Sequence, residues 1–386
     1  MTKPTGAGID TTPAPRFSLS MDAAEPKPDR AFGLDAWGWD DAWSLAFAPS
    51  AGIGLSPARV VAQHRGRWLL HADDGEWPAT PTGRLRHEAL DGDLPAVGDW
   101  VGFLRPPHEG DARIDAVMPR RTAFRRRASG SDAEAQVIAA NVDVLIVATS
   151  LNAELNPRRL ERYAVVGSES GAQVVVALTK SDLADDAEAA VEDLGTLLRL
   201  PVVAVSSHTG SGLDGLDRWL MPGRTVALVG SSGVGKSTLL NHLAGSDLMF
   251  TRQIRDDDAR GRHTTTHREL FRLPSGALML DTPGMRELGL WDAEAGVEDT
   301  FSEIVELAAR CRFHDCAHTS EPGCAVIAEV AAGRLDARRV RSYRKLEREL
   351  AEQPSAAVRR DRAKRFFKVV RNASAESMAR KGYRER

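Results

Sequence analysis

Residues 230–238 have the composition and spacing of a loop that binds nucleotide phosphates. They match the P-loop pattern, in which a glycine, four further residues and Gly-Lys-Ser/Thr follow one another. Its glycines let backbone N–H groups face phosphate oxygens, Lys236 brings positive charge to the outer phosphates, and Ser237 can ligate Mg²⁺. A strand-like run, 225–229, precedes the loop and a helix-like run, 238–243, follows it, so an accidental glycine-rich turn is a weaker interpretation. Expected nucleotide contacts are Gly230, Ser231, Ser232, Gly233, Val234, Gly235, Lys236, Ser237 and Thr238.

A second group of residues could sense the terminal phosphate and its magnesium ion. The tetrapeptide Asp-Thr-Pro-Gly at 281–284 follows a strand-like run. There Asp281 can hold Mg²⁺ through water, and the Gly284 N–H can contact the γ-phosphate. Alone the tetrapeptide is also a good turn, but its place downstream of a P-loop favours the phosphate-sensing role. Between the two motifs, Thr264 and Thr265 are the candidate switch residues that close on Mg²⁺.

The residue that orients the attacking water in Ras-like proteins is missing. In those proteins the glutamine follows the glycine that corresponds to Gly284, whereas Met285 stands at that position here. A methionine cannot position water, so we expect slow intrinsic hydrolysis and dependence on a partner. His267 is a candidate catalytic replacement, although an exposed loop histidine is more often inert.

Two short polar segments, each after a strand-like run, could read the base of the nucleotide. The carboxylate of Asp182 can accept hydrogen bonds from guanine N1–H and the guanine amino group, and the stem of Lys180 can lie over the base. The usual motif has asparagine where Thr179 stands. Each segment alone could be a strand-end turn, but together they favour guanine over adenine. The expected base-reading residues are Thr179, Lys180, Ser181, Asp182, Ser206 and Ser207.

The three cysteines of the chain, together with a histidine, have the spacing of a metal site. Cys311, Cys316, His318 and Cys324 form the pattern C-x4-C-x-H-x5-C. Three thiolates and one imidazole complete a tetrahedral Zn²⁺ site with no place for a substrate water, so we expect one structural zinc ion per chain. The alternatives are three unrelated buried thiols, or His314 as the fourth ligand.

The elements that hold the nucleotide motifs predict an α/β domain with a permuted chain order. Apolar strand-like runs alternate with helices, which indicates a parallel sheet covered on both faces. In ordinary GTPases the P-loop comes first, whereas here Asp182 precedes Gly230 and Asp281 comes last. The predicted strands are 142–149, 174–179, 202–206, 226–230 and 278–281.

Changes in composition along the chain predict a multidomain protein. Short β-type runs from Ala58 to Met118 fit a five-stranded OB-fold barrel, although the pattern does not separate it from an SH3-like barrel. Trp37, Trp39 and Trp43 are expected to dock on the body of the protein. The predicted parts are a disordered extension (1–45), an OB-fold barrel (46–125), a circularly permuted P-loop GTPase domain (130–300), a small mainly helical zinc-binding domain (301–350) and a basic C-terminal tail (351–386).

The bulk properties are those of a globular protein that works away from membranes. No apolar run approaches the roughly 20 residues that cross a bilayer. The first residues lack a basic segment that leads into an apolar stretch, so we expect a cytoplasmic protein without membrane contact. We also expect a monomer. The net charge of −3 does not decide nucleic-acid binding, because the basic residues concentrate in the tail.

With these motifs assembled, the chain resembles the bacterial small-ribosomal-subunit-dependent GTPases of the RsgA (YjeQ) family. The resemblance runs from about residue 55 to about residue 350. Its most specific parts are residues 230–238, 261–266, 281–287 (DTPGMRE) and 311–324. The family combines an OB-fold, a circularly permuted GTPase domain and a zinc finger, and the cysteines and His318 fall on its zinc positions. It also lacks the catalytic glutamine.

The resemblance implies a function and partners. It implies a GTPase that acts in late maturation of the 30S ribosomal subunit, with hydrolysis stimulated by the subunit and coupled to release. GTP or GDP with Mg²⁺, the 30S subunit and its 16S rRNA would be the partners. Independent support comes from the barrel, since OB-folds commonly bind nucleic acids. A basic stretch follows it: Arg120, Arg121, Arg125, Arg126 and Arg127.

Two other functions remain open from the sequence. A nucleotide-gated RNA-binding or scaffold protein could carry the same motifs with hydrolysis incidental. An ATP-dependent kinase or ATPase could share the P-loop, but Asp182 argues against adenine.

Overall fold

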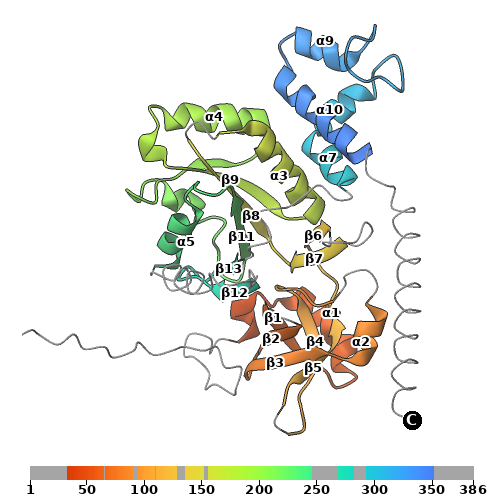
Figure 1. Cartoon of the computed structure of the whole chain (residues 1–386), viewed down its shortest axis with the longest axis vertical. Coiled ribbons are helices and arrows are strands. Elements are labelled where there is room, and N and C mark those ends of the chain that lie inside the picture. Colours follow the sequence, from red (N-terminus) through yellow and green to blue (C-terminus); the bar gives the residue numbers. More distant parts are fainter. Residues whose placement is uncertain are drawn as a thin grey trace, which may run out of the picture.

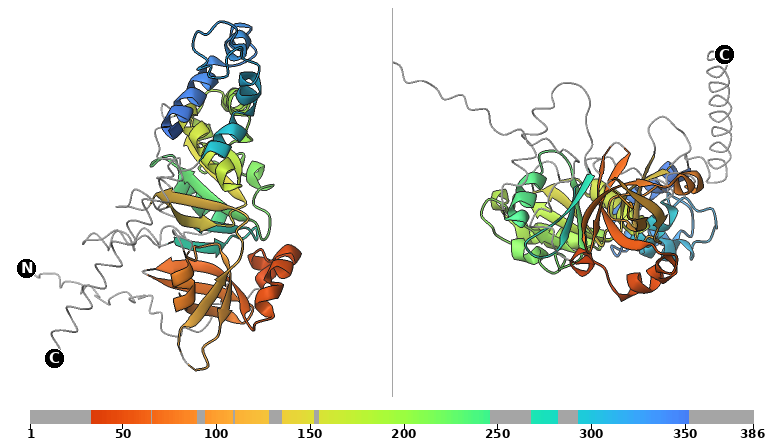
Figure 2. Two further views of the ribbon diagram at one scale, coloured as in Figure 1. Left: turned by 90° about the vertical axis from the view of Figure 1, so that its right-hand side faces the viewer. Right: turned by 90° about the horizontal axis from the view of Figure 1, so that it is seen from below.

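The computed structural model describes residues 33–64, 66–89, 94–108, 110–127, 135–151, 155–245, 268–281 and 293–351. Three parts follow one another along the longest axis of the molecule (Figure 1). A β-barrel lies at one end, an α/β body lies in the middle, and a group of helices lies at the other end. Figure 2 shows the same order from the side.

The first part is a closed five-stranded barrel of the OB type. β1 pairs with β2 and also with β4, which closes the ring, and β3 runs parallel to β5. The short helix α2 (Gly83–Glu88) separates β3 from β4. Val60, Phe103 and Ile114 fill the interior and are fully buried. The strands are β1 (Ser56–His64), β2 (Arg67–Ala72), β3 (Gly75–Pro81), β4 (Trp100–Leu104) and β5 (Ala112–Val117).

An aromatic segment before β1 covers part of the barrel. η2 (Leu34–Trp37) and α1 (Asp41–Ala51) bury Trp37 and Trp43, and Trp39 packs edge-on against Trp100 at 4.8 Å between ring centroids. The docking of these tryptophans is confirmed. The prediction that disorder extends to residue 45 was wrong, because burial of indole rings stabilises the segment from residue 33 onward. Residues 1–32 lie outside the described part.

The middle part contains the predicted parallel sheet. Its strand order is β10-β9-β8-β11-β13-β12, and only β12 runs antiparallel to its neighbour β13. All seven residues of β8 are buried, as expected for a strand covered on both faces. The strands are β8 (Val144–Ser150), β9 (Gln173–Thr179), β10 (Val202–Ala204), β11 (Thr225–Gly230), β12 (Arg268–Arg272) and β13 (Leu278–Asp281). The helices are α3 (Pro157–Ser170), α4 (Ala187–Leu198) and α5 (Lys236–Ala244), with the short η3 (Ser181–Leu183) and η4 (Leu213–Leu216).

Two connections join the barrel to the α/β body. β12 also pairs with β1, with Glu269 opposite Ala62, so the barrel and the body share one continuous sheet. The hairpin of β6 (Ala123–Arg127) and β7 (Ala135–Ala140) lies between the last barrel strand and β8. The sequence pattern indicated neither connection.

A buried arginine holds the same junction together. Arg59 of β1 is 2% exposed, and burial lowers the pKa of its guanidinium to about 10. It donates to the Thr225 hydroxyl at 2.7 Å and to the carbonyl oxygens of Gly98 and Asn141 at 3.3 Å each. The carbonyl oxygen of Trp37 accepts a further bond. One side chain therefore links the aromatic segment, the barrel and the base of the strand that leads to the P-loop.

The third part is a set of helices that packs on the body. Its members are α7 (Glu294–Thr300), α8 (Ser302–Ala308), α9 (Ala325–Ala331) and α10 (Ala337–Ala351). α7 approaches α3 so closely that a Cβ at Gly296 would lie 2.5 Å from the Val165 carbonyl oxygen. None of the helices in the described ranges has the length and apolar character needed to span a membrane.

The Arg59 network generates a stability prediction. In Arg59→Met, buried acceptors lose their donor, so the free energy of unfolding should fall by about 3 kcal/mol. The matched control is Arg67→Met: Arg67 pairs with Asp111 at 2.8 Å but is half exposed, and its loss should cost less than about 1 kcal/mol. Urea unfolding followed by tryptophan fluorescence measures both. Equal destabilisation of the two variants would contradict the role given to Arg59.

Candidate functional site

The P-loop lies between β11 and α5, where the sequence placed it. Gly230, Gly233 and Gly235 adopt positive φ angles of 144°, 78° and 96°. At Gly230 a Cβ would lie 2.2 Å from the Ala148 carbonyl oxygen, so no other residue fits there without a shift of the backbone. The ammonium of Lys236 donates to the Ser231 carbonyl within the loop. Phosphate oxygens are stronger acceptors for this ammonium.

The segment of Thr179 and Lys180 is bonded to the P-loop. The Thr179 hydroxyl lies 2.5 Å from the Val234 carbonyl and 3.2 Å from the Thr149 carbonyl. The Lys180 ammonium donates to the Gly233 carbonyl at 2.8 Å. A buried threonine hydroxyl can thus serve where the usual motif has an asparagine amide.

The two segments predicted to read the base meet at the neighbouring ends of β9 and β10. The Ser206 hydroxyl donates to the Asp182 carboxylate at 2.5 Å, and this bond is the main cause that lowers the pKa of Asp182. The carboxylate is exposed and ionised at neutral pH, so its remaining lone pairs can accept the two N–H donors of guanine. Ser206 is fully buried and Ser207 is half-buried beside it. The sequence pattern did not indicate this side-chain bond.

The strand order brings the predicted magnesium residues to the same edge. β11 and β13 are parallel neighbours, with Ala227 opposite Leu280. Asp281 therefore ends its strand beside the strand that enters the P-loop, and Ser237 is the second residue of the helix that leaves it. Four other predicted site residues, Thr264, Thr265, His267 and Gly284, lie outside the described residues and stay predictions, as does the effect of Met285.

One residue near the phosphate loop was missed by the sequence analysis. Arg159, in the first turn of α3, donates to the Ser231 hydroxyl. The only available signal was topological: α3 follows β8, and β8 pairs with the P-loop strand β11. α3 begins at Pro157, directly after its N-cap residue Asn156.

The basic stretch after the barrel is partly neutralised within the protein. Arg120 pairs with the buried Asp99 at 2.8 Å, and Arg121 pairs with Asp40 at 2.6 Å. Both guanidinium groups are therefore already paired within the protein, which makes them poor candidates for contacts with nucleic-acid phosphates.

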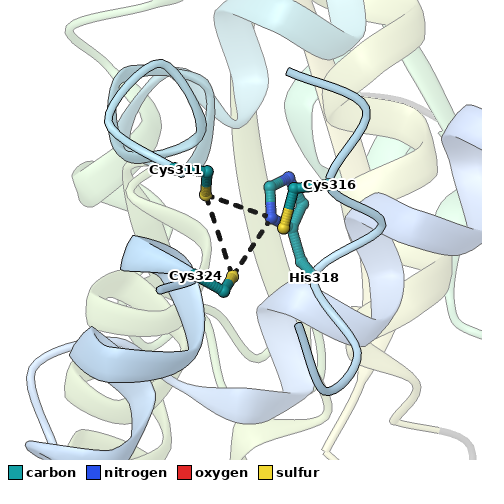
Figure 3. Close-up of side chains that lie close together, drawn as sticks. All are labelled: Cys311, Cys316, His318 and Cys324. Carbon is teal, nitrogen blue, oxygen red and sulfur yellow. Dashed lines mark hydrogen bonds between the residues drawn. The ribbon is translucent and has the colours of Figure 1, made fainter. Parts of the chain in front are cut away.

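The cysteines and His318 converge in the helical part (Figure 3). The Cys311 sulfur lies 3.8 Å from that of Cys324, and His318 Nδ1 lies 3.7 Å and 3.4 Å from these two sulfurs. In a tetrahedral site with metal–sulfur bonds of about 2.3 Å, ligand atoms are separated by about 3.8 Å. With Cys316, all four donor atoms lie within 4.8 Å of one another, so the cluster could bind one metal ion.

The loop between Cys316 and Cys324 is shaped by one carboxylate. Glu321 accepts hydrogen bonds from the backbone N–H groups of Thr319 at 2.7 Å, Ser320 at 3.0 Å and Ala317 at 3.1 Å. These bonds, led by that of Thr319, lower the pKa of Glu321 to about 2. His314 is exposed and stands outside the cluster.

Comparison with known proteins identifies relatives over most of the chain. The profile of the RsgA GTPase family matches residues 117–291. The small ribosomal subunit biogenesis GTPase RsgA of Opitutus terrae is 48% identical over 355 residues, which cover 88% of this chain and 97% of that protein. The protein of the same name from Streptomyces coelicolor is 47% identical over 320 residues, or 82% of this chain and 86% of that protein.

Solved structures share the fold. YjeQ from Thermotoga maritima superposes with a TM-score of 0.58 at 26% identity, covering 78% of this chain and all of that chain. YloQ, described as a circularly permuted GTPase, has a TM-score of 0.55 at 22% identity, covering 78% of this chain and 96% of that chain.

The geometry around Asp182 predicts the basis of guanine specificity. Asp182→Ala should weaken GDP binding by about a hundredfold or more, because two N–H groups of the base lose their acceptor. Asp185→Ala, which removes an exposed carboxylate from the same loop, should leave the affinity unchanged. Titration of a fluorescent GDP analogue measures both. Equal affinity of the two variants, or equal ATP and GTP affinity of the unaltered protein, would refute the assignment.

The convergence of the four ligands predicts a metal-dependent domain. Cys316→Ser and His318→Ala should each release the metal and lower the melting temperature of the helical part while sparing GDP binding. His314→Ala is the matched control and should retain the metal. Elemental analysis of protein purified without chelator measures the metal content. Metal loss in the control, or metal-free unaltered protein, would count against this ligand set.

Proposed function

Since the chain belongs to the RsgA GTPase family and is a GTP hydrolase, we propose that its hydrolysis serves late maturation of the 30S ribosomal subunit. In this proposal the subunit stimulates hydrolysis, and hydrolysis is coupled to release of the protein. The names of the relatives supply the link to the small subunit. One observation in this chain supports binding of a guanine nucleotide. Thr179 and Lys180 donate hydrogen bonds to the P-loop, and Asp182 lies beside them.

The site residues can be given roles in hydrolysis. Backbone N–H groups of the P-loop and Lys236 hold the β- and γ-phosphates, Ser237 and Asp281 hold the magnesium ion, and the Gly284 N–H contacts the γ-phosphate. Bound Mg²⁺ neutralises charge on the phosphate oxygens. Water attacks the γ-phosphorus, the bond to the β–γ bridging oxygen breaks, and GDP and phosphate leave. The proposed switch threonine is Thr264 or Thr265.

The stimulation follows from the missing glutamine. Met285 cannot align the attacking water, so the free protein lacks one component of an efficient site. We propose that the subunit surface supplies or orders this component, with His267 as the candidate residue of this chain. The chain after Asp281 continues into α7, which packs on α3, so the γ-phosphate-sensing segment is directly connected to the helical part.

The metal in the cysteine cluster is proposed to be one structural zinc ion. A set of three thiolates and one imidazole prefers Zn²⁺ over the hard cations, which take oxygen ligands. The four ligands close a tetrahedron, so no position is left for a reacting water. Zinc would therefore stabilise the helical part and take no part in hydrolysis.

The remaining partners also belong to the proposal. Acting on the subunit implies contact with 16S rRNA, a cytoplasmic location and action as a monomer. The barrel supports this, because OB-type barrels commonly present a nucleic-acid-binding face. In the alternative, a nucleotide-gated scaffold, the subunit would bind the protein but would not accelerate hydrolysis.

The proposal predicts subunit-specific stimulation. Phosphate release by the full-length protein should rise by roughly 10³–10⁵-fold at saturating 30S subunits, the gain that a partner completing the site brings to GTPases. The 50S subunit should have little effect. Lys236→Ala should abolish release in every condition, which attributes the phosphate to this protein. Equal rates with 30S, with 50S and without subunits would overturn the ribosomal role, and binding without acceleration would favour the scaffold alternative.

A further inference from the structure

Helix α3 brings an arginine to the phosphate loop that none of the sequence motifs contains. Arg159 donates from Nη1 to the Ser231 hydroxyl, and the carbonyl of the same serine accepts from the Lys236 ammonium. Ser231 therefore lies between two cationic side chains. One belongs to the loop itself, and the other comes from a helix that is 72 residues away in sequence.

The helix that carries Arg159 is held firmly on its other side. Glu161, 2% exposed, lies 3.7 Å from the buried Arg339 of α10, and Arg162 pairs with Glu349 of α10 at 2.6 Å. The close approach of α7 at Gly296 adds a backbone contact further along α3. Arg159 therefore projects from a helix whose position is fixed by contacts that do not involve the loop.

The choice of acceptor shows how Arg159 can act. A P-loop binds phosphate through its backbone N–H groups and its lysine. Arg159 uses neither of these, because its partner is the hydroxyl of Ser231. The contact is therefore compatible with a bound nucleotide. It would hold one end of the loop while the guanidinium adds positive potential close to the phosphates.

We propose that Arg159 is a positioning residue for the phosphate loop. It holds Ser231 so that the N–H groups of the loop are already directed at the phosphate site before nucleotide binds. The position of Arg159 is in turn determined by α3, which is anchored on the helical part. Such preorganisation strengthens binding of GDP and GTP alike, since both present phosphates to the same loop. A catalytic arginine on the γ-phosphate would instead change the hydrolysis step.

The first test compares two adjacent arginines of α3. Arg159→Ala should weaken GDP and the non-hydrolysable GTP analogue GMPPNP by a similar factor of about ten, the worth of one charge-assisted hydrogen bond. Arg158→Ala is the matched control: Arg158 is exposed, has no hydrogen bond or ion pair among the described residues, and should bind as the unaltered chain does. Arg159→Lys, which keeps the charge and a donor, should recover part of the loss. Fluorescent nucleotide titration of the free full-length protein gives all these values without ribosomal subunits.

A double-variant cycle then tests the bond itself. Ser231→Ala removes the acceptor, so Arg159→Ala should weaken binding less in that background than in the unaltered chain. Strictly additive losses, equal affinities of the Arg159→Ala and Arg158→Ala proteins, or slower hydrolysis with unchanged affinities would each overturn the proposal. Thermal melts establish that the variants fold. If the Arg159→Ala protein does not fold, the same cycle is carried out with Arg159→Lys and Ser231→Ala.

Discussion

Parallel pairing of buried strands is the constraint on which the nucleotide site depends. β8 pairs in parallel with β9 and β11, β9 pairs with β10, and β11 pairs with β13. The carboxyl ends of these strands consequently meet at one edge, where ligands bind in open α/β sheets. Each proposed nucleotide contact in the described residues lies at or after such an end. Because pairing rather than chain order defines the edge, a permuted chain can build the same site.

The barrel is attached to that sheet through β12, the last strand in the sheet order of the body. β12 bonds to β13 on one side and to β1 of the barrel on the other, so the barrel is joined to the body by backbone hydrogen bonds as well as by side chains. β12 also follows the candidate switch residues Thr264, Thr265 and His267 directly in sequence. Arg59 adds a second attachment at the base of the P-loop strand. The barrel therefore contacts both the strand that leads into the P-loop and the strand that follows the candidate switch residues.

The helical part combines the Cys–His cluster with buried charge. Arg339 is 3% exposed, and its guanidinium is neutralised by Glu303 and donates to the Leu197 carbonyl at 3.2 Å. Buried charges are tolerated only with such partners. The pairing joins α10 and α8 to the end of α4 in the body, and the Cys–His cluster joins α9 to the loop before it. Short helices that bury little apolar surface can be stabilised by a metal in this way.

The sequence by itself determined the features whose chemistry depends on neighbouring residues: the P-loop, the Asp182 segment, the spacing of the metal ligands and the alternation of strands and helices. It also showed the threonine at position 179, but only the fold shows that its hydroxyl bonds to the P-loop. The tertiary structure decided the pairing of Arg121 with Asp40, the contact of Arg159 with Ser231 and the joining of β12 to β1. In the two side-chain contacts the partners are 81 and 72 residues apart. Local periodicity and turn chemistry carry no information on such distances, because these contacts form only when whole elements pack against one another.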